Sequence, residues 1–307
     1  MGNSANDWRS SHWSSNAIFL VAGSLVALLV LGFLLFRGAT GRTVTVAGDG
    51  ASQQPPDASA PANDTTAAPP LVVYCAAGVK SPVEAIAKAF EQESFGRPIQ
   101  LQFGGSGTLL SNLQIAKRGD LFVAADNSYI DLAREQDLIG EVVAVARQTP
   151  VIAVAKGNPK HIASVDDLAR SDVRLALANP EAASIGQLAK KLLEVTGQWE
   201  KVAANAKVFK PTVSDVANDV MLGTVDAAIL WDANVRQFPE KLEAVDVPDW
   251  QNHPQDVTAG VLKFSEQPEA ALRFAHYMRD PAKGGKEFLS RGYAPVAAAV
   301  TTEAVSP

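Results

Sequence analysis

The chain of 307 residues has little of the chemistry that metal sites, disulfide frameworks and nucleic-acid interfaces require. Its single cysteine, Cys75, excludes an intrachain disulfide. The four histidines, His12, His161, His253 and His276, are far apart and show no metal-ligand spacing. The net charge is −6, and no basic stripe is visible. We therefore expect no protein-bound metal and no nucleic-acid partner.

A run without any charged residue, AIFLVAGSLVALLVLGFLLF, occupies residues 17–36. As a helix, about twenty residues rise about 30 Å, the thickness of a bilayer core. Arg37 follows directly, where a cleaved signal peptide has small residues. We therefore predict an N-terminal flank at residues 1–16 and a single-pass transmembrane signal-anchor at residues 17–36.

A linker is expected between this segment and the folded body. Residues 37–70 are rich in Ala, Pro, Ser, Thr and Asp, a composition typical of a flexible tether. Arg37 and Arg42 flank the apolar run, and the positive-inside rule taken alone mildly favours a cytoplasmic body. The function inferred below requires the opposite orientation, so we predict a body on the extracytoplasmic side of the cell membrane.

From residue 71 to about residue 300, short apolar strands alternate with amphipathic helices. Strands are expected at residues 71–75, 99–103, 121–125, 150–155, 173–178, 206–209, 227–230 and 257–262. Helices are expected at residues 83–92, 109–116, 129–135, 183–196, 213–222, 269–278 and 283–290. The alternation predicts an α/β fold with parallel sheet and helices on both faces. Ligands of such sheets bind beyond the carboxyl ends of the strands.

Glycine-rich junctions stand at two of those strand ends. Residues 104–108, Gly-Gly-Ser-Gly-Thr, follow one strand and open a helix, and residues 75–81 form a similar junction upstream. Backbone N–H groups at a helix N-terminus attract anions. Two such junctions pointing at one place would form an oxyanion pocket. The alternatives are that the glycines serve a tight turn and that Ser106 caps its helix.

An enzyme is not indicated by the same residues. A nucleophile elbow, Gly-x-Ser-x-Gly, needs glycine where Thr108 stands. No histidine is placed by sequence to serve Ser106, and residues 78–81 lack the spacing of a P-loop. We therefore expect a protein without catalytic residues or cofactor. Cys75 ends an apolar strand, where a buried structural thiol is expected.

A more specific pattern is the order of six short segments along the body. They are residues 72–78 (VVYCAAG), 103–109 (FGGSGTL), 119–126 (GDLFVAAD), 179–186 (NPEAASIG), 213–217 (VSDVA) and 226–232 (DAAILWD). This order resembles the periplasmic molybdate-binding proteins of ABC transporters, over about residues 71–297. Residues 119–126 are the most specific match, whereas the glycine-serine loop alone is a weak one.

The resemblance implies a two-lobed periplasmic-binding-protein fold of type II, in which a tetrahedral dianion lies in the cleft. The first lobe would comprise residues 71–150 plus 260–300, and the second residues 151–259. The implied ligand is molybdate or tungstate, and the implied partners are an ABC permease and its ATPase. A binder of sulfate or another oxyanion, and a membrane-tethered anion sensor, remain as alternatives.

The resemblance also implies a set of ligand-binding residues. They are Ala77, Gly78, Gly105, Ser106, Ser184, Ile185, Val216 and Trp231. Two of them depart from the family: Gly78 stands where the family has serine, and Trp231 where it has tyrosine. One hydroxyl donor is thus lost, and an indole N–H replaces a phenol. Lys80 is either a charge-assisted donor beside Gly78 or a solvated residue at a helix start.

Overall fold

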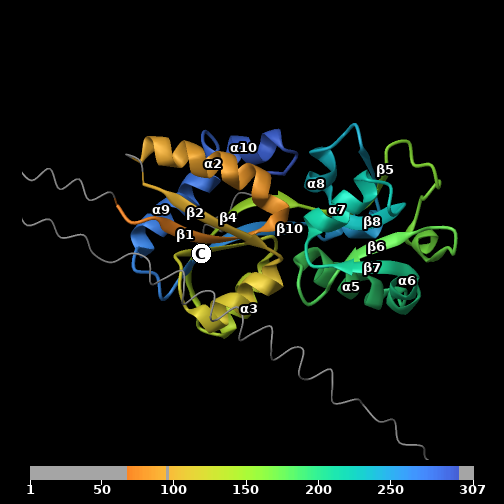
Figure 1. Cartoon of the computed structure of the whole chain (residues 1–307), viewed down its shortest axis with the longest axis horizontal. Helices are drawn as coiled ribbons and strands as arrows, with labels where there is room; N and C mark the ends of the chain where they lie inside the picture. The colour runs from red at the N-terminus through yellow and green to blue at the C-terminus, as the bar shows by residue number, and fades with distance from the viewer. Residues whose placement is uncertain (1–67, 95–96, 297–307) are drawn as a thin grey trace, which may run out of the picture. The chain divides into compact units, whose positions relative to one another are not determined.

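The computed structural model describes residues 68–94 and 97–296, which form two lobes, each built on a five-stranded sheet (Figure 1). The sheet of the first lobe has the order β2 (Ile99–Gly104), β1 (Leu71–Ala76), β3 (Leu121–Ala124), β10 (Gln255–Leu262), β4 (Ile139–Gln148). That of the second lobe has the order β7 (Ala206–Lys210), β6 (Leu175–Ala178), β8 (Ala227–Trp231), β5 (Pro150–Ala155), β9 (Leu242–Val245). The predicted two-lobed α/β fold is confirmed.

Helices cover the sheets of both lobes. The first lobe carries α2 (Lys80–Glu93), α3 (Ser106–Ala116), α4 (Asn127–Glu135), α9 (Pro268–Arg279) and α10 (Gly284–Ser290). The second carries α5 (Ser184–Val195), α6 (Trp199–Asn205), α7 (Val213–Met221) and α8 (Asp232–Arg236). Three 3₁₀ turns complete the described residues: η1 (Ala77–Val79), η2 (Val165–Ala169) and η3 (Pro248–Asn252).

The alternation of side chains along β1 divides the core of the first lobe into two layers. Val73 and Cys75 pack in one cluster with Phe274 of α9. Tyr74, which points to the other face, packs with Leu113 of α3 and with residues of α4. Successive strand residues face opposite sides of a sheet, so one apolar run supplies both layers.

Both sheets are mixed, which corrects the expectation of parallel sheet. β1 pairs in parallel with β2 and β3, whereas β10 is antiparallel to β3 and β4, and β5 is antiparallel to β8 and β9. The reason is that the chain changes lobes. Only Thr149 separates β4 from β5, so one extended segment crosses from the first sheet into the second.

The return crossing lies before β10. All of Gln255–Leu262 is in the sheet of the first lobe, so the expected lobe boundary at residue 260 falls inside a strand. A strand that returns from another lobe can enter the sheet from the opposite end. β10 is therefore antiparallel to its neighbours.

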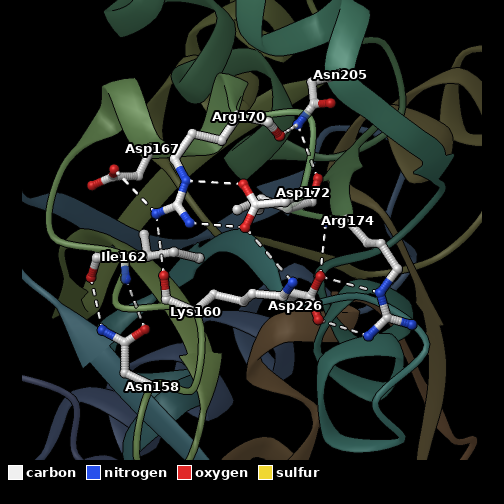
Figure 2. Close-up of polar contacts among 10 residues, drawn as sticks. Asn158, Lys160, Ile162, Asp167, Arg170, Asp172, Arg174, Asn205 and Asp226 are labelled. Carbon is white, nitrogen blue, oxygen red and sulfur yellow. Dashed lines mark hydrogen bonds and ion pairs between the residues drawn. The ribbon is translucent and has the colours of Figure 1, made fainter.

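Surface ion pairs and hydrogen bonds fasten the loops of the second lobe (Figure 2). Arg170 donates through Nε and Nη2 to the carboxylate of Asp172, at 3.1 and 2.9 Å. Arg174 Nη2 donates to Asp226 Oδ1 at 2.6 Å, and this guanidinium holds the pKa of Asp226 below its ordinary value. The side chain of Asn158 bonds both backbone groups of Ile162. These carboxylates have their own cations and belong to the architecture of the lobe.

The predicted signal-anchor at residues 17–36 and the linker up to residue 67 lie outside the described residues. Within residues 68–94 and 97–296, no helix is long and apolar enough to cross a membrane.

Candidate functional site

The N-termini of α3 and α5 meet across the two lobes. Ser106 begins α3 in the first lobe and Ser184 begins α5 in the second. Their hydroxyl oxygens are 3.2 Å apart, and both residues are buried, with exposed fractions of 1% and 3%. Two hydroxyls that are 78 positions apart in sequence are thus brought together at two positively polarised helix ends.

Backbone donors of the first helical turns lie beside this point. The first N–H groups of a helix have no acceptor within that helix. Ser106 occupies such a position in α3, and Ser184 and Ile185 do so in α5. Ser106, Ser184 and Ile185 thus lie at helix starts, and their role in binding an anion stays a prediction.

Two further backbone donors of the glycine loop already make hydrogen bonds to the second lobe. Gly107 N–H and Thr108 N–H both donate to the carbonyl oxygen of Ala182, at 2.9 and 3.3 Å. A Cβ on Gly105 would lie 2.2 Å from that oxygen and 2.5 Å from Pro211 O. The glycines of this loop therefore allow the backbones of the two lobes to touch, a role that the sequence analysis did not anticipate.

The first junction, η1, is held by side chains from elsewhere in the chain. Ser214 Oγ, on α7, donates to Ala77 O at 3.1 Å. In a trans peptide the C=O of one residue points away from the N–H of the next, so this bond also directs Gly78 N–H away from Ser214. Asn234 Nδ2 and Tyr293 Oη donate to Gly78 O at 2.8 and 2.6 Å. Burial raises the pKa of Tyr293, so its hydroxyl stays protonated and donates.

The two residues that depart from the family pattern are neighbours in space. A Cβ on Gly78 would lie 2.9 Å from Val213 Cγ1 and 3.8 Å from Trp231 Cδ1. Trp231 is 0% exposed, and its indole Nε1–H has no hydrogen-bond partner within the described part of the chain. A buried donor without a partner is costly, so this N–H is expected to donate to a water or a ligand.

Val216 agrees less well with the prediction that its backbone N–H binds the ligand. It is 0% exposed on α7, and its N–H donates to Thr212 O at 3.3 Å. This N–H is therefore engaged, by a long bond, at the start of its own helix. Thr212 caps the same helix by accepting from Asp215 N–H.

Lys80 lies on the surface. Its side chain is 53% exposed and lies 3.7 Å from Glu84, one turn along α2. Its ammonium also lies 5.2 Å from the ring centre of Phe103. These contacts favour the solvated alternative over a contact with an anion.

Cys75 is completely buried, and burial raises the pKa of its thiol, which keeps it protonated and unreactive. Two buried carboxylates, Asp126 and Asp232, accept hydrogen bonds from groups of the chain. Asp126 caps α4 by accepting from Ser128 N–H, and burial raises its pKa. Asp232 accepts from Thr149 N–H and pairs with Arg236. Asp232 is thus paired with a cation, whereas Asp126 has hydrogen-bond donors but no cation within 4 Å among the described residues.

Two buried amides beside the site were not predicted from the sequence. Asn234 follows β8 by three residues, and Gln148 ends β4; they are 8% and 1% exposed. Gln148 Nε2 donates to Ala125 O at 2.8 Å, and Ala125 N–H donates to Ser106 Oγ at 3.2 Å. The only available signal was a polar residue next to the end of a buried strand, which is too common to be specific.

Comparison with known proteins identifies a family and relatives of similar sequence. Residues 71–293 match the family described as bacterial extracellular solute-binding protein. A binding protein of Haemophilus influenzae is 30% identical over 226 residues, covering 73% of this chain and 91% of the relative. The molybdate-binding protein ModA of Mycobacterium tuberculosis is 29% identical over 218 residues, covering 71% and 82%.

Solved structures share the fold at lower identity. The periplasmic molybdate-binding protein of Azotobacter vinelandii superimposes with a TM-score of 0.62 at 18% identity, covering 74% of this chain and 99% of that one. The sulfate-binding protein SubI of Mycobacterium tuberculosis gives 0.64 at 16% identity, covering 75% and 88%. Together with the family match, which covers most of the chain, these findings show that the protein belongs to the bacterial extracellular solute-binding proteins.

Proposed function

We propose that this protein is the solute-binding component of an ABC importer and captures a tetrahedral oxyanion, molybdate or tungstate. The observation that carries the proposal is the meeting of two helix N-termini at Ser106 and Ser184, whose buried hydroxyls are 3.2 Å apart. Helix N-termini bind oxyanions through unpaired N–H groups without needing a cationic side chain.

In this proposal the donors come from both lobes. The first lobe supplies the loops of Ala77 and Gly78 and of Gly105 and Ser106. The second supplies Ser184, Ile185 and the indole of Trp231. The N–H of Val216 takes part only if its long bond to Thr212 O is released. Neither half of the site satisfies a dianion alone, so the ligand binds the closed cleft more tightly and shifts the population toward it.

The choice of oxyanion rests on relatives and on chemistry. The fold is shared with a molybdate-binding and a sulfate-binding protein at similar TM-scores, so the fold does not choose between them. Several relatives found by sequence are named as molybdate-binding proteins, which favours molybdate. Sulfate has the same charge but is smaller, so donors spaced for molybdate would not all reach it.

The transport role requires partners that recognise the closed form. We infer a permease and its ATPase, with the binding domain on the extracytoplasmic side and the chain tethered through residues 17–36. The description of the family as extracellular supports the location of the domain. A membrane-tethered sensor of anion level is the alternative, and ATPase stimulation by the ligand-bound protein separates the two.

The test is titration calorimetry of the purified full chain, in detergent, with molybdate, tungstate, sulfate and phosphate. Tight 1:1 binding of molybdate and tungstate, with sulfate far weaker, is expected. Preference for sulfate would change the assigned ligand. Absence of binding to all four oxyanions would refute the proposed function.

A further inference from the structure

Two buried polar atoms near Gly78 lack partners among the described residues. One is the donor Trp231 Nε1–H, and the other is the acceptor Asn234 Oδ1. The acceptor lies 3.5 Å from the place that a Cβ on Gly78 would occupy, and the indole Cδ1 lies 3.8 Å from it. An anion satisfies the donor, but no anion satisfies the acceptor, so a donor-only description of the site is incomplete.

The orientation of the Asn234 amide follows from its other bond. Its Nδ2 donates to Gly78 O at 2.8 Å. Turning the amide over would place its oxygen against that carbonyl oxygen, and two acceptors cannot share a hydrogen bond. Oδ1 must therefore face the other way, where it needs a hydrogen from a group outside the described protein atoms.

Glycine at position 78 leaves this place without a side chain. A Cβ there would lie 2.9 Å from Val213 Cγ1, so a separate molecule beside Asn234 Oδ1 has to lie farther from Val213 than a Cβ would. A buried water needs a polar site with two to four hydrogen-bond partners.

We propose that Asn234 holds a water molecule beside Gly78, and that this water completes the oxyanion site. It donates one hydrogen to Asn234 Oδ1 and the other to an oxygen of the bound anion, and so supplies the hydroxyl that Gly78 lacks. Asn234 is then a positioning residue: Nδ2 orients the Gly78 carbonyl and Oδ1 places the water. This inference rests on the proposed oxyanion function.

Calorimetry with molybdate on two full-chain variants tests the role of Oδ1. Asn234→Leu removes both the bond to Gly78 O and the acceptor for the water. The matched control, Tyr293→Phe, removes the other hydrogen bond to the same carbonyl and leaves Oδ1 in place. We expect Asn234→Leu to weaken molybdate binding at least about tenfold, and Tyr293→Phe to weaken it several-fold less. Equal losses in the two variants would mean that Asn234 acts only through the carbonyl, and would overturn the inference.

A crystal structure of the wild-type protein with molybdate shows whether the water is present, even if Asn234→Leu does not fold. A water within hydrogen-bond distance of both Asn234 Oδ1 and a molybdate oxygen is expected. A molybdate complex without that water would refute the inference while leaving the proposed function intact. If wild-type protein binds no oxyanion in calorimetry, the proposed function fails first, and this inference fails with it.

Discussion

Replacing Gly107 by alanine should keep the two lobes from closing on an oxyanion. A Cβ at this position would lie 2.2 Å from Glu181 O, a backbone atom of the second lobe, and 3.0 Å from Tyr129 Oη. An unstrained contact between carbon and oxygen needs at least about 3.2 Å, so the facing backbones would have to separate by about 1 Å. Backbone cannot rotate away as a flexible side chain can.

The cost follows from the contacts that a separation of this size breaks. They are the hydrogen bonds from Gly107 N–H and Thr108 N–H to Ala182 O, and the one between the hydroxyls of Ser106 and Ser184. Each contributes about 1 kcal/mol, so closure becomes less favourable by about 2 to 3 kcal/mol, or roughly 30- to 150-fold in molybdate affinity. Alanine has the better helix propensity, so α3 itself should not be weakened.

The assay is calorimetry with molybdate, together with small-angle scattering with and without the ligand. The matched control is Gly140→Ala, because a Cβ there meets nothing closer than Val261 O at 3.9 Å. The control should bind like the wild type and become more compact with ligand, whereas Gly107→Ala should bind weakly and stay extended. If Gly107→Ala matches the control in both measurements, binding does not require the close contact between Gly107 and Glu181 O.

Three further changes test individual groups of the site and of its scaffold. Ser106→Ala should weaken oxyanion binding by about 1 to 3 kcal/mol in calorimetry, and unchanged affinity would leave the hydroxyl a purely structural role. Trp231→Phe should weaken molybdate binding about tenfold, because the indole donor is lost. A lower melting temperature with unchanged affinity would show that Trp231 has only a structural role in the core. The folded-state pKa of Asp226 lies below its ordinary 3.8 because of Arg174, so the pair stabilises the fold above pH 3.8 and the contribution disappears as the pH falls through the lower folded value. Urea unfolding should therefore show Asp226→Asn to be less stable than the wild type at pH 7 and the two to converge in acid; a constant difference would contradict this.

Much of the local structure could be predicted from short-range patterns. β1, α3 and β3 lie where apolar runs, glycines and helical spacing place them, and Cys75 is buried as its strand predicts. The strands β4 and β9 and the short helices α6 and α8 were not predicted. α8 has only five residues, too few for periodicity to show.

Short-range patterns in the sequence account for the alternation of strands and helices and for the glycine and serine loops. These depend on residues within a few positions of one another, where spacing and backbone sterics act directly. Contacts between distant segments, by contrast, bring Ala182 O to the donors of the glycine loop and Asn234 and Tyr293 to the Gly78 carbonyl, and they set β10 antiparallel to β3. The partners in these hydrogen bonds are 74 to 215 positions apart. No local pattern encodes which backbone group will lie opposite a given carbonyl once two lobes have closed.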